Sequence, residues 1–459
     1  MASSSSDGTS HPDGIFSLLD TDLYKLTMQC AVLKFFPNTE VAYAFTNRTP
    51  QMKLNREAFE WLQTQVDKLA NVTVTKEETD WLKKTCPYFS QEYLDFLQGF
   101  HLKPKEHIKL SFTTTTDSSD VSAFGDVSVE TRGLWVETIL YEIPLLALVS
   151  EAYFKFVDRD WTHDGQTEKA KQKGIELLQY GCVFSEFGSR RRRDYKTHEM
   201  VMQGLIEASN EAKSNGKAWN GKFTGTSNVH MAMRFGVLPI GTVAHEWFMG
   251  IAAIEDDYAN ANEKALQCWT ATFGRGVLAI ALTDTFGTPA FLKAFAKPAP
   301  KSGTMDAHDA DGKDPSYAQI FTGVRQDSGD PMEFLKRIKA FYTSHSIHEH
   351  KTIVFSDSLN IAKCLEYQAA TVAHGLTPSF GIGTFLTNDF THVSGGGEKS
   401  VPLNIVIKLS EAGGRHAVKL SDNKGKNMGD DELVRKVKAV VSYEEREWGE
   451  GDEGHRWDQ

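Results

Sequence analysis

Residues 278–287 read LAIALTDTFG, and residues 321–330 read FTGVRQDSGD. In each, a short apolar run ends in small and polar residues, as a β-strand followed by a loop does. Five more stretches repeat the pattern: VFSEFGSRRRR (183–193), KFTGTSN (222–228), LPIGTVAHEW (238–247), TIVFSDSLN (352–360) and SFGIGTFLTND (379–389). Helical segments such as 249–273 and 331–345 separate several of them, which predicts parallel strands with right-handed crossovers. Seven such units favour a closed α/β barrel over an open sheet. The barrel should be irregular, because the second crossover is too short for a full helix.

The carboxyl ends of parallel strands meet at one rim, where α/β barrels carry their active sites. Polar residues follow strands in many proteins simply because loops are solvated. Seven consecutive strand ends rich in Asp, Arg, His and Gly instead favour one shared site. The predicted rim residues are Arg190, Ser227, His245, Asp284, Arg325, Asp327, Asp357 and Thr384.

The rest of the chain predicts a second domain. Residues 15–160 mix helical and strand patterns without regular alternation, which indicates an α+β domain. Residues 161–400 form the predicted barrel, and residues 401–459, a β-hairpin and tail, should pack on the N-terminal domain. We expect residues 1–14 to be a disordered tail and 297–317, rich in Pro, Gly and Asp, to be a mobile insertion of open role.

Composition narrows the classes of function. The net charge of −11 argues against binding to nucleic acid, which needs a broad positive surface. No apolar run is long enough for a membrane span. Five scattered cysteines and the lack of an apolar leader fit a reduced, cytoplasmic protein. A nuclear pool is left open.

Two motifs suit phosphate. Gly188 is followed by Ser189 and the run Arg190–Arg193, whose guanidinium groups match phosphate oxygens. A solvated charge run or a nuclear-import patch would explain the arginines without a ligand. Gly381-Ile-Gly383-Thr384 offers backbone N–H groups and a hydroxyl for a 5′-phosphate, although a plain turn would explain it equally well.

Carboxylates and one histidine complete the predicted site. Asp327 and Asp357 can bind ribose hydroxyls or hold Mg²⁺ through water, whereas Asp330, just before Pro331, fits a helix cap. His245 follows a buried strand, where a histidine is more often structural. Among phosphate-binding groups it can also accept a phosphoryl group.

Several ordered motifs together resemble the nicotinate phosphoribosyltransferase family, in its fungal form, from about residue 15 to the C-terminus. They are Leu18-Leu-Asp-Thr-Asp22-Leu-Tyr24-Lys25, Glu186-Phe-Gly-Ser-Arg190-Arg191, Gly225-Thr-Ser227-Asn228, Gly241-Thr242-Val-Ala-His245-Glu246, Arg325-Gln-Asp327-Ser-Gly-Asp330, Phe355-Ser-Asp357 and Gly381-Ile-Gly383-Thr384.

The resemblance implies that nicotinate and 5-phosphoribosyl 1-diphosphate are joined to give nicotinate mononucleotide and diphosphate in NAD biosynthesis. It also implies Mg²⁺ and coupling to ATP hydrolysis through a phosphohistidine at His245. Tyr24, Thr242 and Arg325 would contact nicotinate, and Arg190, Arg191, Gly383 and Thr384 would bind phosphate. Asp284, Asp327 and Asp357 would lie near the ribose and Mg²⁺, with Asp357 a candidate for holding the metal.

Three alternatives remain at this stage. The substrate could be nicotinamide, but relatives that use the amide carry Asp where this chain has Ser227, and Ser227 with Arg325 favours the acid. Quinolinate would need more cations for its second carboxylate. A barrel that binds a nucleotide without catalysis would not need His245, Asp327 and Asp357 together. The sequence leaves open whether the protein is a monomer or a homodimer, and whether a second subunit completes the site.

Overall fold

The structure is a computed structural model. It describes residues 13–114, 123–214, 219–301, 303, 309, 313–423 and 427–443. The predicted N-terminal tail, the C-terminal acidic tail (447–459) and much of the predicted 297–317 insertion lie outside these residues. In the part of the chain that the structure describes, no helix has both the length and the apolar character needed to cross a bilayer.

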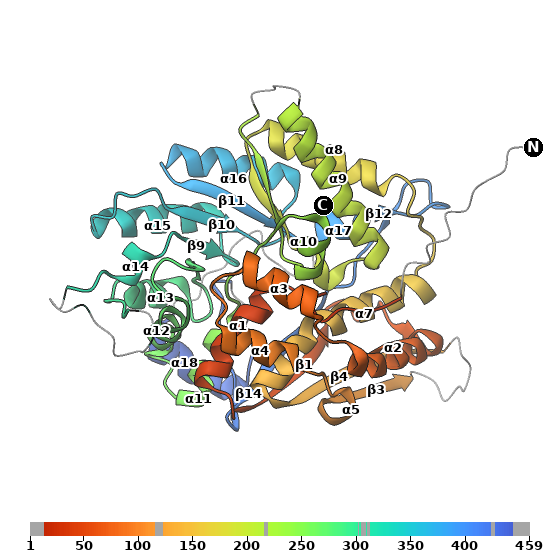
Figure 1. Cartoon of the computed structure of the whole chain (residues 1–459), viewed down its shortest axis with the longest axis horizontal. Coiled ribbons are helices and arrows are strands. Elements are labelled where there is room, and N and C mark those ends of the chain that lie inside the picture. The colour runs from red at the N-terminus through yellow and green to blue at the C-terminus, as the bar shows by residue number, and fades with distance from the viewer. Residues whose placement is uncertain are drawn as a thin grey trace, which may run out of the picture.

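Seven parallel strands form the barrel sheet, as the seven stretches predict. Their order is β7-β6-β5-β11-β10-β9-β8. The strands are β5 (Val183–Glu186), β6 (Lys222–Thr226), β7 (Leu238–Pro239), β8 (Ile280–Leu282), β9 (Gly323–Gln326), β10 (Thr352–Phe355) and β11 (Thr377–Ile382). Helices lie on the outside of this sheet, as Figure 1 shows for α8, α15 and α16. They are α8 (Gln166–Gln179), α9 (Tyr195–Ser214), α10 (Val229–Phe235), α11 (His245–Glu255), α12 (Ala261–Phe273), α13 (Thr288–Phe295), α14 (Tyr317–Ile320), α15 (Pro331–Ser344) and α16 (Ile361–Ala373).

The barrel is irregular, as expected, but the strand ladder is not closed. It ends at β7 and β8, so the sheet curls without pairing its two edges. The strand β7 has two residues, and the helix α10 before it has seven. Thr242 bridges the gap, because its hydroxyl donates to the Ile280 carbonyl at 3.1 Å and its own carbonyl accepts from Thr27 at 2.6 Å. The short crossover therefore leaves an opening that the helix carrying Thr27 fills.

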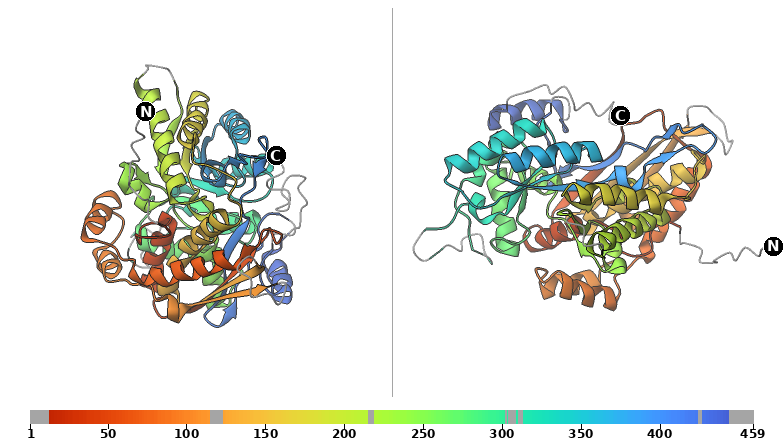
Figure 2. Two further views of the ribbon diagram at one scale, coloured as in Figure 1. Left: turned by 90° about the vertical axis from the view of Figure 1, so that its right-hand side faces the viewer. Right: turned by 90° about the horizontal axis from the view of Figure 1, so that it is seen from above.

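The second domain is an antiparallel sheet covered by helices. Its path is β15-β14-β1-β4-β2, with β3 on β4. The strands are β1 (Glu40–Asn47), β2 (Leu54–Asn55), β3 (Ile108–Thr114), β4 (Phe124–Leu134), β14 (Ile405–Ala412) and β15 (Arg415–His416). The strand β14 pairs with β1 from Val41↔Ala412 to Asn47↔Ile405, which confirms that the C-terminal hairpin completes this domain. Figure 2 shows the blue hairpin beside the orange and red strands.

The helices of this domain begin where the sequence caps them. Thr75 and Glu78 form a reciprocal capping box at the start of α3, and Asn55 and Ser90 cap α2 and α4. The helices and short turns are α1 (Leu23–Phe35), α2 (Arg56–Lys68), η1 (Leu69–Asn71), α3 (Lys76–Thr85), α4 (Gln91–Gln98), α5 (Pro104–His107), α6 (Trp135–Thr138), η2 (Ile139–Tyr141) and α7 (Glu142–Phe156). Smaller elements follow the barrel or connect it: η3 (Ser189–Arg191), α17 (Thr384–Thr387), β12 (Phe390–Thr391), β13 (Lys399–Ser400) and α18 (Asp431–Val441).

The two domains share a core of aromatic side chains. Trp135 of α6 and Trp247 of α11 are both fully buried, with ring centroids 6.0 Å apart, and Phe36 lies 5.9 Å from each. A side chain at Gly250 would collide with the Trp135 ring. This close packing fixes the start of α11, where His245 lies, against the N-terminal domain.

Candidate active site

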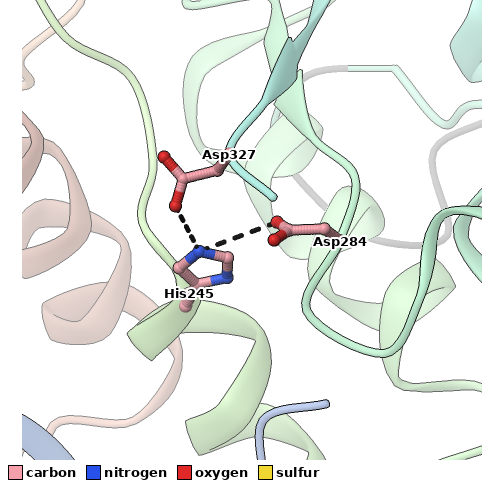
Figure 3. Close-up of side chains that lie close together, drawn as sticks. All are labelled: His245, Asp284 and Asp327. Carbon is pink, nitrogen blue, oxygen red and sulfur yellow. Dashed lines mark hydrogen bonds and ion pairs between the residues drawn. The ribbon is translucent and has the colours of Figure 1, made fainter. Parts of the chain in front are cut away.

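His245 is the first residue of α11 and lies between side chains from two neighbouring strand ends. Its Nε2 is 2.9 Å from Asp327 Oδ2 and 3.6 Å from Asp284 Oδ1 (Figure 3). Its Nδ1 is 3.0 Å from Thr285 Oγ1. Asp284 and Thr285 follow β8, and Asp327 follows β9, so the parallel arrangement brings them together as the rim argument predicts.

The next residue anchors the histidine. Glu246 is buried and accepts hydrogen bonds from Trp135 Nε1 at 2.7 Å and from the Tyr43 hydroxyl. It also pairs with the fully buried ammonium of Lys25, which binds Glu142 at 2.6 Å. Because Lys25, Tyr43 and Trp135 belong to the N-terminal domain, that domain holds the backbone at His245 in place.

The electrostatics of the cluster keep His245 neutral. Burial lowers the pKa of His245 to about 4, and Lys419 acts in the same direction, while Asp284 and Asp327 act against it. At neutral pH the imidazole is therefore uncharged and keeps a nitrogen lone pair, which is what a phosphoryl acceptor requires.

Asp327 is held as a carboxylate. Burial opposes its charge, but Arg325, His245 and Lys419 outweigh burial and hold the pKa of this carboxyl well below its usual range. Arg325 Nη2 donates to Asp327 Oδ1 at 2.7 Å, and Ser356 Oγ donates to the same oxygen at 2.7 Å. Arg325 also donates from Nε to Ser356 at 2.8 Å, so the pair is tied to the end of β10.

One carboxylate oxygen of Asp284 accepts a hydrogen bond, and the other accepts none. Ser328 Oγ donates to Oδ2 at 2.5 Å, whereas the buried Oδ1 accepts no hydrogen bond. Donor atoms of His245, Asp284 and Asp327 all lie within 4.8 Å of one another. Two carboxylate oxygens at this spacing suit a hard cation such as Mg²⁺, which prefers oxygen ligands. Asp357, the sequence candidate for this role, lies outside the group, and its Oδ1 accepts from Ser358 at 3.0 Å.

A second group of charges surrounds the buried Tyr24 of α1. Burial raises the pKa of the Tyr24 hydroxyl well above its usual value; Glu142 and Asp22 add to this effect, and Arg190 and Arg325 oppose it. Arg190 Nη1 lies 3.6 Å from Glu142 Oε1, and 41% of the Arg190 side chain is exposed. The predicted nicotinate contacts Tyr24 and Arg325 are therefore neighbours, with Arg190 beside them.

The predicted phosphate elements come from adjacent strands. The pairing of β11 with β5 aligns Ile382 with Glu186, and Phe187 N donates to the Ile382 carbonyl at 2.8 Å. Gly383 begins α17, and a Cβ there would lie 3.1 Å from the Phe187 carbonyl oxygen, so the close approach of the two loops favours glycine. Gly381, Gly383 and Thr384 thus lie beside the loop that carries Arg190.

Comparisons with known proteins agree with this geometry. Residues 182–445 match the model of the nicotinate phosphoribosyltransferase (NAPRTase) family, and residues 19–150 match its N-terminal domain. The nicotinate phosphoribosyltransferase of Saccharomyces cerevisiae is 45% identical over 450 residues, covering 96% of this chain and 99% of that protein. This chain belongs to the nicotinate phosphoribosyltransferase family.

Solved structures extend the comparison to the fold. A crystal structure from Saccharomyces cerevisiae, 44% identical, superposes with a TM-score of 0.86 over 95% of this chain and all of that one. The nicotinate phosphoribosyltransferase structure from Vibrio cholerae is 30% identical, with a TM-score of 0.79 over 95% of this chain and 96% of that one. The irregular seven-stranded barrel and the sheet shared by both termini are thus features of this phosphoribosyltransferase family.

Three arginines of the 190–193 run have structural partners in this family member. Arg191 donates from Nε and Nη2 to the Ile405 carbonyl, at 3.1 and 3.0 Å, and from Nη2 to Asn404 at 2.8 Å. Arg192 makes a two-pronged pair with Asp20, and Arg193 lies 3.7 Å from the centre of the Phe154 ring. All three are at most 5% exposed. A phosphate contact by Arg191 stays a prediction, whereas Arg190 is partly exposed beside Glu142.

Ser227 also has a partner within the protein. Its fully buried hydroxyl donates to Asp22 Oδ1 at 2.7 Å, and Ser189 donates to the same oxygen at 2.6 Å. A direct contact between Ser227 and the substrate stays a prediction. The structure adds that both hydroxyls hold the Asp22 carboxylate near Tyr24.

The sequence argument missed two lysines of the C-terminal segment. Lys408 lies on β14, and Lys419 follows the hairpin with 6% of its surface exposed. Burial lowers the pKa of Lys408 well below its usual value, and Lys419, Arg48 and Arg190 add to this effect. Neither ammonium has an ion pair among the described residues. Such a concentration of cations beside Asp327 and His245 indicates an anion site. The one sequence signal for these lysines was Lys408, which interrupts the otherwise apolar run IVIKL.

Proposed function

We propose that this chain joins nicotinate to 5-phosphoribosyl 1-diphosphate, giving nicotinate mononucleotide and diphosphate in NAD biosynthesis, and couples the reaction to ATP cleavage through a phosphohistidine at His245. The observation that carries the proposal is the His245 imidazole between two carboxylates, with Nε2 2.9 Å from Asp327 and 3.6 Å from Asp284. Family membership of nearly the whole chain supports the reaction class. We expect the enzyme to act in the cytoplasm.

The substrate groups can be matched to the charges of the site. The loop Gly381–Thr384 and Arg190 suit the 5′-phosphate of the ribosyl substrate, and Lys408 and Lys419 suit the diphosphate. The pocket around Tyr24, with Arg190 and Arg325 nearby, suits a pyridine ring that carries a carboxylate. Nicotinamide has no charge to pair with these arginines, which favours the acid.

During bond exchange at C1 of the ribose, both the positive charge on the ribose ring and the negative charge on the leaving diphosphate must be stabilised. The pyridine nitrogen donates its lone pair to C1 while the C1–oxygen bond breaks, and the diphosphate leaves with that electron pair. Positive charge grows on the ribose ring, where the carboxylates of Asp327 and Asp284 lower its energy. Asp284 and Asp327 would hold Mg²⁺, which supplies charge neutralisation for the departing diphosphate when bound.

The ATP step uses the neutral histidine. An imidazole nitrogen attacks the γ-phosphorus of ATP, the bond to the β-phosphate oxygen breaks, and ADP leaves. Asp327 accepts from the ring at Nε2, where it orients the imidazole and stabilises its positive charge. The new phosphoryl group brings negative charge close to Lys419, so we expect it to reorder the contacts of that lysine.

A diphosphate-release assay tests the proposal. We expect release from 5-phosphoribosyl 1-diphosphate with nicotinate, stimulated by ATP, and much less with nicotinamide or quinolinate. The variant His245→Ala should lose both ATP stimulation and acid-labile phosphate, whereas the control His345→Ala, at an exposed position, should keep both. Undiminished ATP stimulation in His245→Ala would contradict the phosphohistidine, and no release with any pyridine would favour a non-catalytic nucleotide-binding barrel.

A further inference from the structure

The segment that we assign to the 5′-phosphate runs directly into a helix of a single turn. The helix α17 has four residues, and two internal hydrogen bonds of 2.9 Å reach the carbonyls of Gly383 and Thr384. A single turn is unstable by itself, because fixing its backbone costs more free energy than its few hydrogen bonds return. The positions of Gly383 and Thr384 therefore depend on the segments that contact α17 from outside.

One set of outside contacts comes from the loop after β5. Thr387 Oγ1 donates to the Gly188 carbonyl at 2.9 Å, and Arg193 N donates to the Thr387 carbonyl at 3.2 Å. Asn388 Nδ2 donates to the Arg191 carbonyl at 2.8 Å. These bonds join α17 to a neighbouring loop of the same rim.

A second set comes from α8, on the outer layer of the barrel. Lys173 Nζ donates to the Phe385 carbonyl and to Asp389 Oδ2, both at 2.7 Å, and lies 4.0 Å from the centre of the Phe385 ring. Lys169 Nζ donates to the Asp389 carbonyl at 2.6 Å and lies 3.1 Å from Asp389 Oδ2. The Phe385 carbonyl belongs to the last turn of α17, where a helix leaves its carbonyls without an internal partner. Lys173 therefore holds both the helix and the segment after it with one ammonium group.

Lys173 is the more deeply placed of the two lysines. Its side chain is 9% exposed, against 37% for Lys169. Burial lowers the pKa of Lys173 to about 8. The charged groups that act on it are Asp389, which opposes this effect, and Lys169 on α8 and Lys399 on β13, which add to it. The ammonium is therefore mostly charged at neutral pH and loses its charge as the pH rises through about 8.

From this geometry we propose that Lys173 is a positioning residue for the ribosyl substrate: paired with Asp389, it holds α17 so that Gly383 and Thr384 meet the 5′-phosphate. The inference rests on the proposed function and adds a residue of the outer layer on which substrate affinity depends. Lys173 acts through Phe385 and Asp389 and not by contact with the substrate.

The variant Lys173→Met tests this role. Methionine keeps an unbranched stem beside Phe385 and removes the ammonium, while Lys169 remains next to the Asp389 carboxylate. We expect the dissociation constant of 5-phosphoribosyl 1-diphosphate, measured by calorimetry with Mg²⁺, to rise about tenfold, because two charge-assisted hydrogen bonds are lost. The KM for this substrate should rise with it, whereas kcat and the KM for nicotinate should change less than about twofold.

A control on the same helix is Lys171→Met. Lys171 pairs with Glu211 at 3.5 Å, away from α17, and its loss should leave both substrate affinities unchanged. Unchanged affinity for 5-phosphoribosyl 1-diphosphate in Lys173→Met, or an equal rise in KM for both substrates, would overturn the positioning role. If the wild type binds this substrate but releases no diphosphate with nicotinate, the proposed function fails, and the binding comparison still decides the role of Lys173.

A second variant covers the case in which Lys173→Met does not fold. Asp389→Asn removes the charge partner but keeps a side chain of the same size, so it should raise the same dissociation constant about threefold. No rise in Asp389→Asn would overturn the pairing as the positioning device.

The pH dependence gives a measurement that a merely structural lysine would not change. Between about pH 7 and about pH 9.5 the wild type loses the charge of Lys173, so its affinity for 5-phosphoribosyl 1-diphosphate should approach that of Lys173→Met. The ratio of the two dissociation constants should therefore fall by about half or more over this range. A constant ratio would overturn the role of the ammonium charge in holding α17.

Discussion

Two regions of the barrel rim carry similar charged residues in the sequence, but the structure uses those charges differently. After β8 and β9, the charged residues Asp284, Arg325 and Asp327 contact one another and His245, and part of that cluster stays open. After β5, the side chains of Glu186 and Arg191–Arg193 are bound within the fold; Glu186, for example, pairs with His198 at 2.8 Å. In the first region an oxygen of Asp284 accepts no hydrogen bond, whereas in the second region these charges are taken up by partners within the fold. The predictions below test that contrast.

The largest expected effect is on stability, in the region after β5. Arg192→Met should lower the apparent free energy of unfolding by about 3–5 kcal/mol, because it strands the buried Asp20 carboxylate. Urea denaturation followed by tryptophan fluorescence measures this loss. The matched variant Arg190→Met should cost under about 1 kcal/mol, since that side chain is 41% exposed. Equal losses would remove the distinction between the two arginines.

The next effect is on catalysis, in the region after β8 and β9. Asp327→Asn should lower kcat/KM by about 100-fold, because it removes a carboxylate that contacts His245 and that we propose to stabilise positive charge on the ribose. Asp357→Asn, outside the cluster, should cost less than about tenfold. Steady-state diphosphate release measures both. A larger loss for Asp357→Asn would return the main carboxylate role to the position that the sequence suggested.

Conservative substitutions of the adjacent Arg190 and Arg191 should distinguish the roles of these two residues. Arg190→Lys should raise KM for 5-phosphoribosyl 1-diphosphate about tenfold without changing Tm, because lysine cannot reproduce a planar fork. Arg191→Lys should leave KM unchanged and cost about 1–2 kcal/mol of stability through its bonds to Ile405 and Asn404. A rise in KM for Arg191→Lys would show that this residue also meets the substrate.

The smallest effect is a pH dependence near Arg192. Burial raises the pKa of Glu151 to about 7, above the usual value of 4.5. A raised pKa means that the folded state binds the proton more readily, so this group lowers stability progressively as pH rises from about 4.5 through 7. Glu151→Gln should therefore raise Tm at pH 8 more than at pH 5, while its amide oxygen still accepts from Gly14 N. An equal shift at both pH values would contradict a buried titrating carboxyl.

Much of the fold was predictable because its signals are local. Seven apolar runs with polar ends, the Asp330 cap before Pro331 and the hairpin near 405–416 each follow from residues a few positions apart in the chain. The predicted closed barrel is not formed: the sheet ends at β7 and β8, and β7 has only two residues with which to pair. The helices α4 and α18 were not expected either, although α18 has an apolar face that buries Val434, Val437 and Val441.

The sequence predicted which residues gather at the active site, but it did not predict the role of each residue. Strand-end logic placed His245, Asp284, Arg325 and Asp327 together, because parallel strands end at one rim whatever their loops do. It could not separate Asp327 from Asp357, or Arg190 from Arg191, because exposure and partners depend on segments distant in the chain, such as Ile405 for Arg191 and His245 for Asp327. Lys408 and Lys419 were missed for the same reason: only the folded hairpin brings them to the rim.

The sequence by itself determined which strands exist, which way they run and which residue types follow them, since alternation and capping act over a few residues. Tertiary structure alone decided which charges remain available. Desolvation and pairing act through space, so the carboxylate that neutralises Arg192 comes from residue 20, and the lysine that helps keep His245 uncharged comes from residue 419.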